Sequence, residues 1–130
     1  MPTQIRIIVK HIEKMEEKFF LVSEGDKIFR IPLNEIFHFT ARRSLTIVTT
    51  KEKQYVHGKN IGNVKKEVDG NGNFTQTHKS YLLNMNHVIC FSKKGDGCAI
   101  LKDGSEVPVA RRRKKNFLKH MSQINVTVGF

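Results

Sequence analysis

The sequence predicts a mainly β protein built from small antiparallel sheets with two short helices. Short segments rich in β-branched and aromatic residues recur at close spacing along the chain. Clusters of Gly, Asn and Asp between them tolerate the positive backbone φ angles that tight hairpin turns require. Only two stretches place apolar residues at helical spacing instead. A length of 130 residues suits a single module with one sizeable core.

Eleven segments are expected to form strands, most of them joined by hairpins. They are Ile5 to Val9, Phe19 to Ser23, Lys27 to Ile31, Ile36 to Ala41, Leu45 to Thr50, Lys53 to Val56, Phe74 to Thr77, Tyr81 to Asn84, Val88 to Ser92, Cys98 to Leu101 and Val107 to Val109. In the fifth segment Leu45, Ile47 and Thr49 share one face, and Thr46, Val48 and Thr50 share the other.

Two stretches are expected to be helical. Asn60 is a candidate N-cap, and Ile61, Val64 and Val68 follow it on one helical face until the Gly-rich run at 70–72 ends the helix. A second helix is expected from Arg111 to Met121, with an apolar edge of Phe117, Leu118 and Met121 and a basic remainder. Pro108 just before it suits an edge strand.

The order of these elements suggests a division of the chain into three parts. Residues 1–24 are expected to be a strand or linker segment, residues 25–125 the folded domain, and residues 126–130 a tail. Cys90 and Cys98 flank a turn signal, and in a reducing compartment we expect both to be small buried apolar residues. A cross-strand disulfide is the alternative if their strands pair.

The strong positive charge indicates a polyanionic partner. Lys and Arg total 23 against 12 Asp and Glu, which gives a formal net charge of +11. Such an excess favours nucleic acid or an anionic membrane surface as the partner. The sequence has no apolar run of the roughly 20 residues that a transmembrane helix needs, and its start lacks a secretory signal core. We therefore expect a cytoplasmic protein with no membrane segment.

Three basic segments beside expected strands are candidate nucleic-acid contacts. Arg42-Arg43 stands at one expected hairpin tip, Thr77-His78-Lys79-Ser80 stands at another, and Arg111-Arg112-Arg113-Lys114-Lys115 follows the last strand. The guanidinium of Arg presents a fork of donors that matches guanine edges and phosphate oxygens. Basic loop tips and charge runs are also common as plain solvated surface, and the segments alone leave that role open.

Nothing in the sequence assembles a catalytic or metal-binding group. The six histidines show no paired spacing, the two cysteines have no zinc-type spacing, and no Gly-rich phosphate loop is present. The acidic residues fall mostly in charged turns. These observations predict a protein that is not an enzyme and that uses no cofactor or metal.

Three motifs occur in a definite order along the chain. The most specific is Phe74-Thr75-Gln76-Thr77-His78-Lys79-Ser80-Tyr81-Leu82-Leu83-Asn84. Asp103-Gly104 and then Val107-Pro108-Val109-Ala110-Arg111-Arg112 follow it, and Ile31 to Phe39, with its Glu35-Ile36 step before a strand, precedes it. Together the motifs, which span about residues 28–121, resemble the LytTR family of bacterial DNA-binding domains, the output domains of many response regulators. The first is similar to the family signature Phe-x-x-x-His-Arg-Ser-x-x-Val-Asn.

The resemblance implies an elongated stack of small antiparallel sheets whose protruding loops enter successive major grooves of double-stranded DNA. It implies base contacts from Arg43 or Ser44 at the first tip, from Lys79 at the second and from Arg111 at the third. The implied phosphate contacts are Arg42, His78, Ser80, Arg112, Arg113 and Lys115.

The resemblance also implies bacterial transcription regulation, a dimer on tandem direct repeats and an upstream receiver domain, for which 130 residues leave no room. Two positions depart from the family pattern. Lys79 replaces the common Arg or Asn, so that contact becomes a point charge, and Ala110 replaces a Ser whose hydroxyl would contact phosphate or cap the last helix. The alternative function is a basic interaction module that docks an acidic protein or an anionic membrane.

Overall fold

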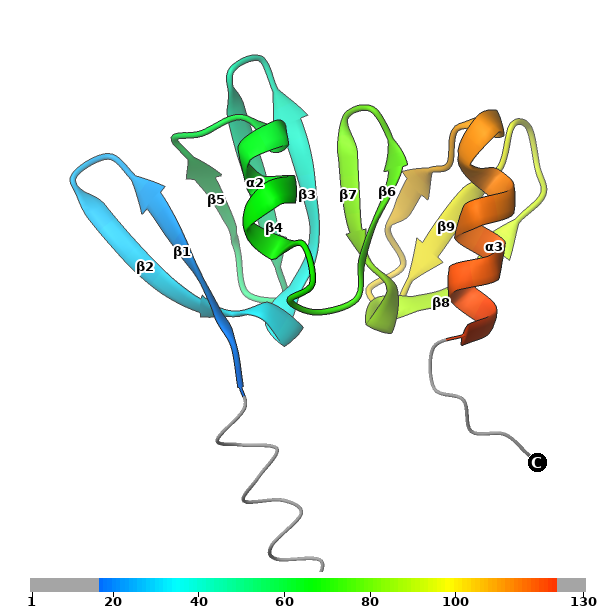
Figure 1. The fold of residues 1–130 in the computed structure, drawn as a ribbon, viewed down its shortest axis with the longest axis horizontal. Helices are drawn as coiled ribbons and strands as arrows, with labels where there is room; N and C mark the ends of the chain where they lie inside the picture. The colour runs from blue at the N-terminus through cyan, green and yellow to red at the C-terminus, as the bar shows by residue number, and fades with distance from the viewer. Residues whose placement is uncertain (1–16, 124–130) are drawn as a thin grey trace, which may run out of the picture.

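The computed structural model describes residues 17–123, which form three antiparallel β-sheets and two α-helices (Figure 1). The strands of this part of the chain are β1 (Phe19–Glu24), β2 (Lys27–Pro32), β3 (Ile36–Arg42), β4 (Leu45–Thr50), β5 (Gln54–His57), β6 (Phe74–His78), β7 (Tyr81–Asn84), β8 (Val88–Ser92), β9 (Cys98–Leu101) and β10 (Glu106–Pro108). The helices are α2 (Ile61–Val68) and α3 (Lys114–Gln123), with 3-10 turns at η1 (Leu33–Glu35), η2 (Met85–His87) and η3 (Arg111–Arg113).

The three sheets stand in a row along the long axis of the molecule (Figure 1). The hairpin β1-β2 lies at one end, the five-stranded sheet β5-β4-β3-β7-β6 lies in the middle, and the three-stranded sheet β10-β9-β8 lies at the other end. Every strand pair is antiparallel. The mainly β fold class with small antiparallel sheets and two short helices is confirmed.

The five-stranded sheet separates two hydrophobic cores. Leu82 and Leu83 are neighbours on β7 and therefore face opposite sides of the sheet. Leu82 packs into a core with α2 and the β1-β2 hairpin, and Leu83 packs into a core with α3 and the three-stranded sheet. The first core contains Phe20, Val22, Ile31, Leu33, Ile36, Phe39, Val48, Val64, Val68 and Leu82. The second contains Phe37, Leu83, Met85, Ala99, Leu101, Val107, Val109 and Phe117.

Helix α2 forms as the apolar spacing predicted. The side chain of Asn60 accepts a hydrogen bond from the backbone N–H of Asn63 at 2.9 Å and so caps the first turn. Val64 and Val68 are buried in the first core, and Ile61 packs against its edge. On β4 the buried face is that of Thr46, Val48 and Thr50.

Asn84, the last residue of the signature motif, has a structural role. Its side chain is 2% exposed and donates from Nδ2 to the carbonyl oxygen of Ile36 at 2.9 Å. Its Oδ1 accepts the backbone N–H of Asn86 at 3.0 Å. These bonds satisfy a buried amide and tie the end of β7 to the start of β3, because unpaired buried polar groups destabilise a fold.

The predicted start of the last helix is wrong. Arg111–Arg113 forms the 3-10 turn η3, closed by the Arg113 N–H and the Ala110 carbonyl at 2.8 Å, and the α-helix begins only at Lys114. Ala110 provides no side-chain cap, so the entry to the helix is satisfied by this tighter backbone turn instead. Phe117 is buried as expected, whereas Leu118 is exposed.

The predicted burial of both cysteines is also wrong. Cys90 is exposed and Cys98 is only half-buried, and both are free thiols. The register of β8 on β9 shifts between Val88 and Cys90, so the inward and outward alternation of the strand is broken there. Cys90 faces Ile100, and Cys98 faces Ser92, across the ladder.

Some sequence predictions concern residues at the ends of the chain. The expected strand Ile5 to Val9 and the expected tail 126–130 lie outside the described residues. The expected domain boundary after residue 24 falls within the β1-β2 hairpin, because Glu24 pairs with Lys27. Phe20 and Val22 of β1 also belong to the first core.

Candidate nucleic-acid interface

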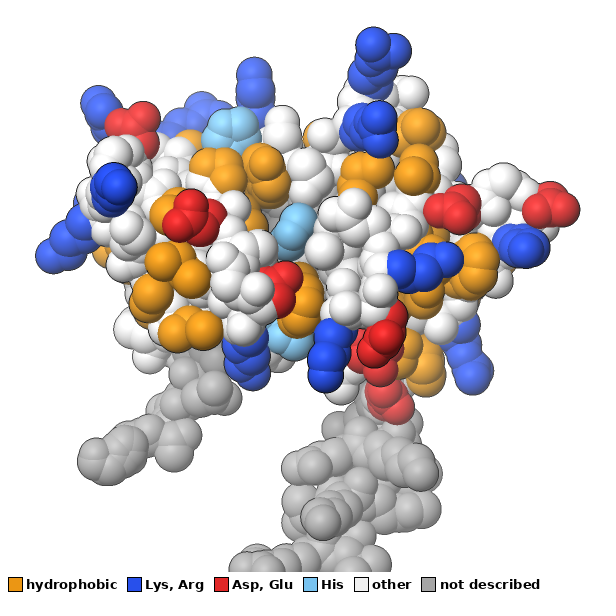
Figure 2. All heavy atoms as spheres, turned by 180° about the vertical axis from the view of Figure 1, so that it is seen from behind, with side chains coloured by type: hydrophobic (Ala, Val, Ile, Leu, Met, Phe, Trp, Pro, Cys, Tyr) orange, Lys and Arg blue, Asp and Glu red, His pale blue; other side chains and the backbone are white. Residues whose placement is uncertain are grey.

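The three basic segments identified in the sequence lie along one edge of the molecule. The β3-β4 turn, the β6-β7 turn and the start of η3 all point toward the upper edge in Figure 1. Figure 2 shows the molecule from behind, with Lys and Arg side chains rising from that same edge. Sequence segments that are far apart are thus brought together as a row of three tips, which we call the tip edge.

The first tip is the two-residue loop Arg43-Ser44. Arg42 pairs with Leu45 at the end of the β3-β4 ladder, so only these two residues turn the chain. Arg43 has a φ of +57°, in the left-handed region that favours glycine. Arg42, Arg43 and Ser44 are all exposed. A cationic side chain is therefore held at the point of a hairpin despite an unfavourable backbone conformation.

The second tip is the β6-β7 turn. Lys79 is exposed at its point, and His78 and Ser80 on either side are half-buried. The backbone N–H of Ser80 donates to Nδ1 of His78 at 3.2 Å, and the imidazole meets the ring of Tyr81 edge-on at 5.8 Å between centroids. The histidine thus shapes the turn from inside, while Lys79 is left free to reach a ligand.

The third tip combines η3 with the β8-β9 loop. The side chain of Arg111 is 86% exposed, and its Nη2 donates to Oδ1 of Asp96 at 2.8 Å. Arg112 and Lys115 are exposed as well. An exposed pair of this kind adds little stability, so its main effect is to direct the guanidinium of Arg111. Sequence reasoning missed Asp96, because it assigned the Gly95-Asp96-Gly97 segment only a turn role.

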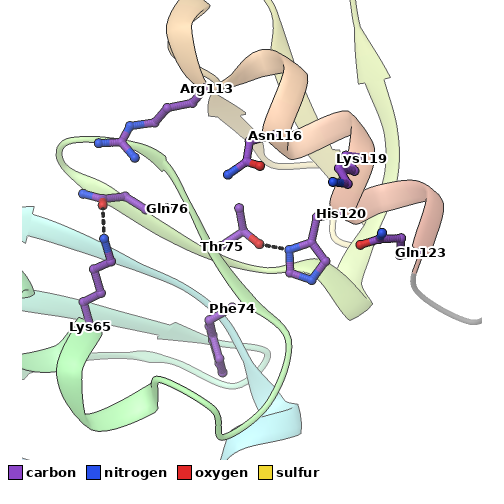
Figure 3. Close-up of a pocket in the computed structure, with 9 residues that line it drawn as sticks. All are labelled: Lys65, Phe74, Thr75, Gln76, Arg113, Asn116, Lys119, His120 and Gln123. Atoms are coloured by element: carbon purple, nitrogen blue, oxygen red, sulfur yellow. Dashed lines mark hydrogen bonds between the residues drawn. The ribbon is translucent and has the colours of Figure 1, made fainter.

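Arg113 differs from the other residues of the basic run. It is half-buried, and its Nε is buried without a hydrogen-bond partner among the residues that the structure describes. Its side chain lines a cavity between α2 and α3 together with Gln76 and Lys65 (Figure 3). The structure therefore groups Arg111 and Arg112 at the tip edge and turns Arg113 toward this cavity.

Backbone hydrogen bonds fix the order and spacing of the tips. The N–H of Ala41 donates to the carbonyl oxygen of Ser80 at 2.8 Å, and the N–H of Ala110 donates to the carbonyl oxygen of Thr77 at 2.7 Å. The strands β3 and β7 are direct neighbours in the central sheet. In the order β4-β3-β7-β6 the midpoints of the two hairpins are two strand spacings apart. Because neighbouring strands lie about 4.8 Å apart, the first and second tips are separated by about 10 Å.

The described part of the chain contains no cluster of side chains suited to a metal ion. Between residues 17 and 123 no group of three or more His, Cys, Asp or Glu side chains could hold a metal ion. His38, on β3 behind the first tip, has its pKa lowered by burial, with Asp103 acting weakly in the opposite direction. None of the helices in this range is long and apolar enough to cross a membrane.

A comparison with known protein families matches residues 26–122 to the LytTr DNA-binding domain. The chain belongs to this family. The match covers all three tips, the whole second core and the first core apart from Phe20 and Val22. The order of the three motifs in the sequence had implied the same family, and that prediction is confirmed.

The chain is also similar to curated bacterial proteins. The transcriptional regulatory protein YpdB of Escherichia coli K12 is 29% identical over 101 residues, which are 75% of this chain and 41% of that protein. The YpdB protein of Shigella flexneri matches to the same extent. The chain thus spans about two fifths of the length of these curated relatives.

Among solved structures, the fold is similar to the LytTr DNA-binding domain of a putative methyl-accepting/DNA response regulator from Bacillus cereus. The TM-score is 0.69 at 18% identity, over 81% of this chain and 97% of that one. The resemblance of the backbone along nearly the whole of that domain establishes the fold.

Proposed function

We propose that this chain binds double-stranded DNA sequence-specifically, as a regulator of bacterial transcription. The observation that carries the proposal is the tip edge, in which three basic tips of a LytTr domain are held in one row by backbone hydrogen bonds. A rigid row of cations with exposed Arg side chains suits a duplex, because phosphates attract the cations and base edges accept the guanidinium donors.

The residues of the tip edge divide into two roles. Arg43 or Ser44, Lys79 and Arg111 stand at the points of the tips and are proposed to contact bases. Arg111 is the strongest candidate, because Asp96 directs its guanidinium and a bidentate Arg to guanine contact is the commonest specific one. The proposed phosphate contacts at the tip edge are Arg42, His78, Ser80, Arg112 and Lys115, whereas Arg113, which the sequence had also marked, faces the cavity between α2 and α3.

The tips are proposed to reach successive major grooves on one side of the duplex. Such grooves lie about 34 Å apart, whereas the two hairpin tips are about 10 Å apart. The first and third tips stand at the two ends of the row and are therefore the pair proposed to reach neighbouring grooves, while Lys79 at the second tip is proposed to contact a base edge between them. Long Arg side chains at both outer tips extend the reach, and bending of the duplex toward the tip edge closes the remaining gap.

Binding as two copies on tandem direct repeats belongs to the same proposal, as does control by an upstream receiver domain in a full-length protein. If two copies bind head to tail, methylation of guanine N7 should interfere with binding at two positions, separated by one helical turn or a multiple of it. Interference at a single position would contradict the tandem arrangement.

Selection of duplexes from a random pool with the purified chain tests the proposal most directly. We expect enrichment of one sequence, and we expect Arg111→Ala to weaken binding to it by about 1–3 kcal/mol and to relax the base preference at one position. Lys66→Ala removes the same charge from an exposed position on α2 and serves as the control. An equal loss of affinity for random DNA in Arg111→Ala would contradict the proposal. Failure to enrich any duplex, combined with tight binding of the protein to anionic vesicles, would contradict it as well.

A further inference from the structure

A cavity of about 520 Å³ opens between the two helices, on a face of the molecule next to the tip edge (Figure 3). Its floor is β6, one wall is α2, and the other wall is η3 with α3. The volume lies within the range of small-molecule sites, which is about 300–1,000 Å³. The cavity therefore lies where η3 and α3 pack beside β6 and α2.

The charged residues that line the cavity are all cations. Lys65 comes from α2, Arg113 from η3 and Lys119 from α3. None of the described residues that line it is Asp or Glu. Three cations that converge without a carboxylate repel one another, and a bound anion would relieve that repulsion.

Neutral hydrogen-bonding groups complete the lining. The side-chain oxygen of Gln76 accepts a hydrogen bond from Nζ of Lys65 at 2.7 Å, which leaves the amide NH₂ of Gln76 free to donate. Asn116 extends from α3 toward the same space (Figure 3). The Nε of Arg113 is buried without a partner among the described residues, and an unsatisfied buried donor of this kind calls for an explanation.

We propose that this cavity is a binding site for a phosphate group, held by Lys65, Arg113 and Lys119 and oriented by the amides of Gln76 and Asn116. Phosphate oxygens take several charge-assisted hydrogen bonds at once, and the mixture of a guanidinium, two ammonium groups and amides supplies them. The phosphate comes either from a free phosphorylated small molecule or from the backbone of DNA bound at the tip edge.

His120 supplies an independent signal of occupancy. It lies at the side of the cavity, hydrogen-bonded to Thr75, and burial lowers its pKa below the ordinary 6.5. The other titratable groups that line the cavity are Lys65, Arg113 and Lys119. A bound phosphate would place negative charge beside the imidazole, so the pKa of His120 should rise on binding.

Calorimetric titration of the complete chain with pyrophosphate, in low salt and without DNA, tests the site. We expect saturable binding that Lys65→Gln and Lys119→Gln each weaken about tenfold or more, which is the effect of losing one hydrogen bond to a charged group. Lys66→Gln is the matched control, because Lys66 neighbours Lys65 on α2 but does not line the cavity. Equal weakening by Lys66→Gln, or a titration of His120 by NMR that pyrophosphate leaves unchanged, would overturn the proposal.

Titration in the presence of the selected duplex separates the two sources of phosphate. If DNA supplies the phosphate, Lys65→Gln and Lys119→Gln weaken DNA binding beyond Lys66→Gln, and pyrophosphate competes with the duplex. If a free ligand supplies it, pyrophosphate binds the protein–DNA complex as well as it binds the free protein. Pyrophosphate binding is measured without DNA, so its absence would leave the proposed DNA-binding function standing. Failure to select a duplex would likewise leave the pyrophosphate result unaffected.

Discussion

Arg43 holds a conformation that works against its own residue type. A non-glycine residue at φ +57° costs about 1–2 kcal/mol relative to glycine in the same turn. Strain retained at an exposed hairpin point indicates that the side chain is kept for what it contacts. We predict that Arg43→Gly leaves the melting temperature unchanged or higher and lowers affinity for the selected duplex.

A substitution at the neighbouring Ser44 provides the comparison for Arg43→Gly. Ser44 is exposed in the same loop, and φ is positive at Arg43 alone among the described non-glycine residues. Ser44→Ala should therefore leave stability nearly unchanged, and its effect on binding shows which of the two residues reads the DNA. Full affinity in Arg43→Gly with a loss in Ser44→Ala would assign the first tip to Ser44.

His57 makes the stability of the fold depend on pH. Its ring is 2% exposed, and Nδ1 accepts the backbone N–H of Ser23 at 3.0 Å. Burial lowers its pKa from 6.5, while Glu67 and Lys59 act in opposite directions on it. The unfolded chain therefore binds the proton more readily, and the free energy of unfolding should decrease as the pH falls through 6.5.

Urea denaturation between about pH 7.5 and pH 5 measures this dependence. His57→Asn keeps an acceptor near the position of Nδ1 but does not titrate, so its stability should fall less steeply. Burial lowers the pKa of His38, His87 and His120 in the same direction, so some dependence should remain in the variant. A rise in stability on acidification would contradict the prediction.

At the scale of elements, the β8-β9 loop is held in place by a glycine. Gly97 has a φ of +104°, and a Cβ there would come within 2.5 Å of the Phe91 ring. The N–H of Val109 donates to the Gly97 carbonyl at 3.1 Å, so the loop is tied directly to the chain that leads into η3. Displacement of the loop would separate Asp96 from Arg111.

We predict that Gly97→Ala is more destabilising than Gly95→Ala. Both glycines have positive φ, but a Cβ at Gly95 would meet nothing within 4 Å. The shared backbone strain is about 1–2 kcal/mol, and the overlap with Phe91 adds roughly another 1–3 kcal/mol. Thermal denaturation of the two variants isolates the second contribution. Equal losses would show that the Phe91 ring moves aside freely.

The elements also show what a sequence can reveal. The strands and α2 follow from alternation and apolar spacing, because each pattern is local and records which face is buried. The residue before the 3-10 turn η3 is tied to a distant strand by the hydrogen bond from the Ala110 N–H to the Thr77 carbonyl, and the exposure of Cys90 accompanies a register shift against β9. Contacts with a distant partner leave no periodic signal in the sequence.

The same distinction applies to the candidate site. Arg43, Lys79 and Arg111 were identifiable because cations at expected turns and an ordered set of motifs mark them. The ion pair of Arg111 with Asp96, and the convergence of Lys65 with Lys119, join elements that are separated along the chain. Only the packing of the three sheets brings those side chains together.

At the scale of the whole molecule, charge sets the salt dependence of DNA binding. Three of the proposed phosphate contacts at the tip edge are Arg or Lys, namely Arg42, Arg112 and Lys115. Each neutralised phosphate contributes about −0.9 to the slope of log K against log salt, so we predict a slope of about −3 on the selected duplex.

Fluorescence anisotropy at salt concentrations of roughly 50–200 mM measures the slope. Arg112→Gln should reduce its magnitude by about 1 on both selected and random duplexes, since phosphate contacts do not distinguish sequences. A slope near zero would contradict the electrostatic basis of the proposed interface.

The hydrogen bonds from Ala41 to Ser80 and from Ala110 to Thr77 are made entirely by main-chain atoms. The interval between the tips is thus independent of which side chains occupy them, as long as the strands pair. Substitution at the proposed base contacts Arg43, Lys79 and Arg111 should therefore change the preferred bases, while the distance between the recognised positions stays the same. We expect a lineage of such domains to acquire new target sequences by point mutation and to retain one common spacing.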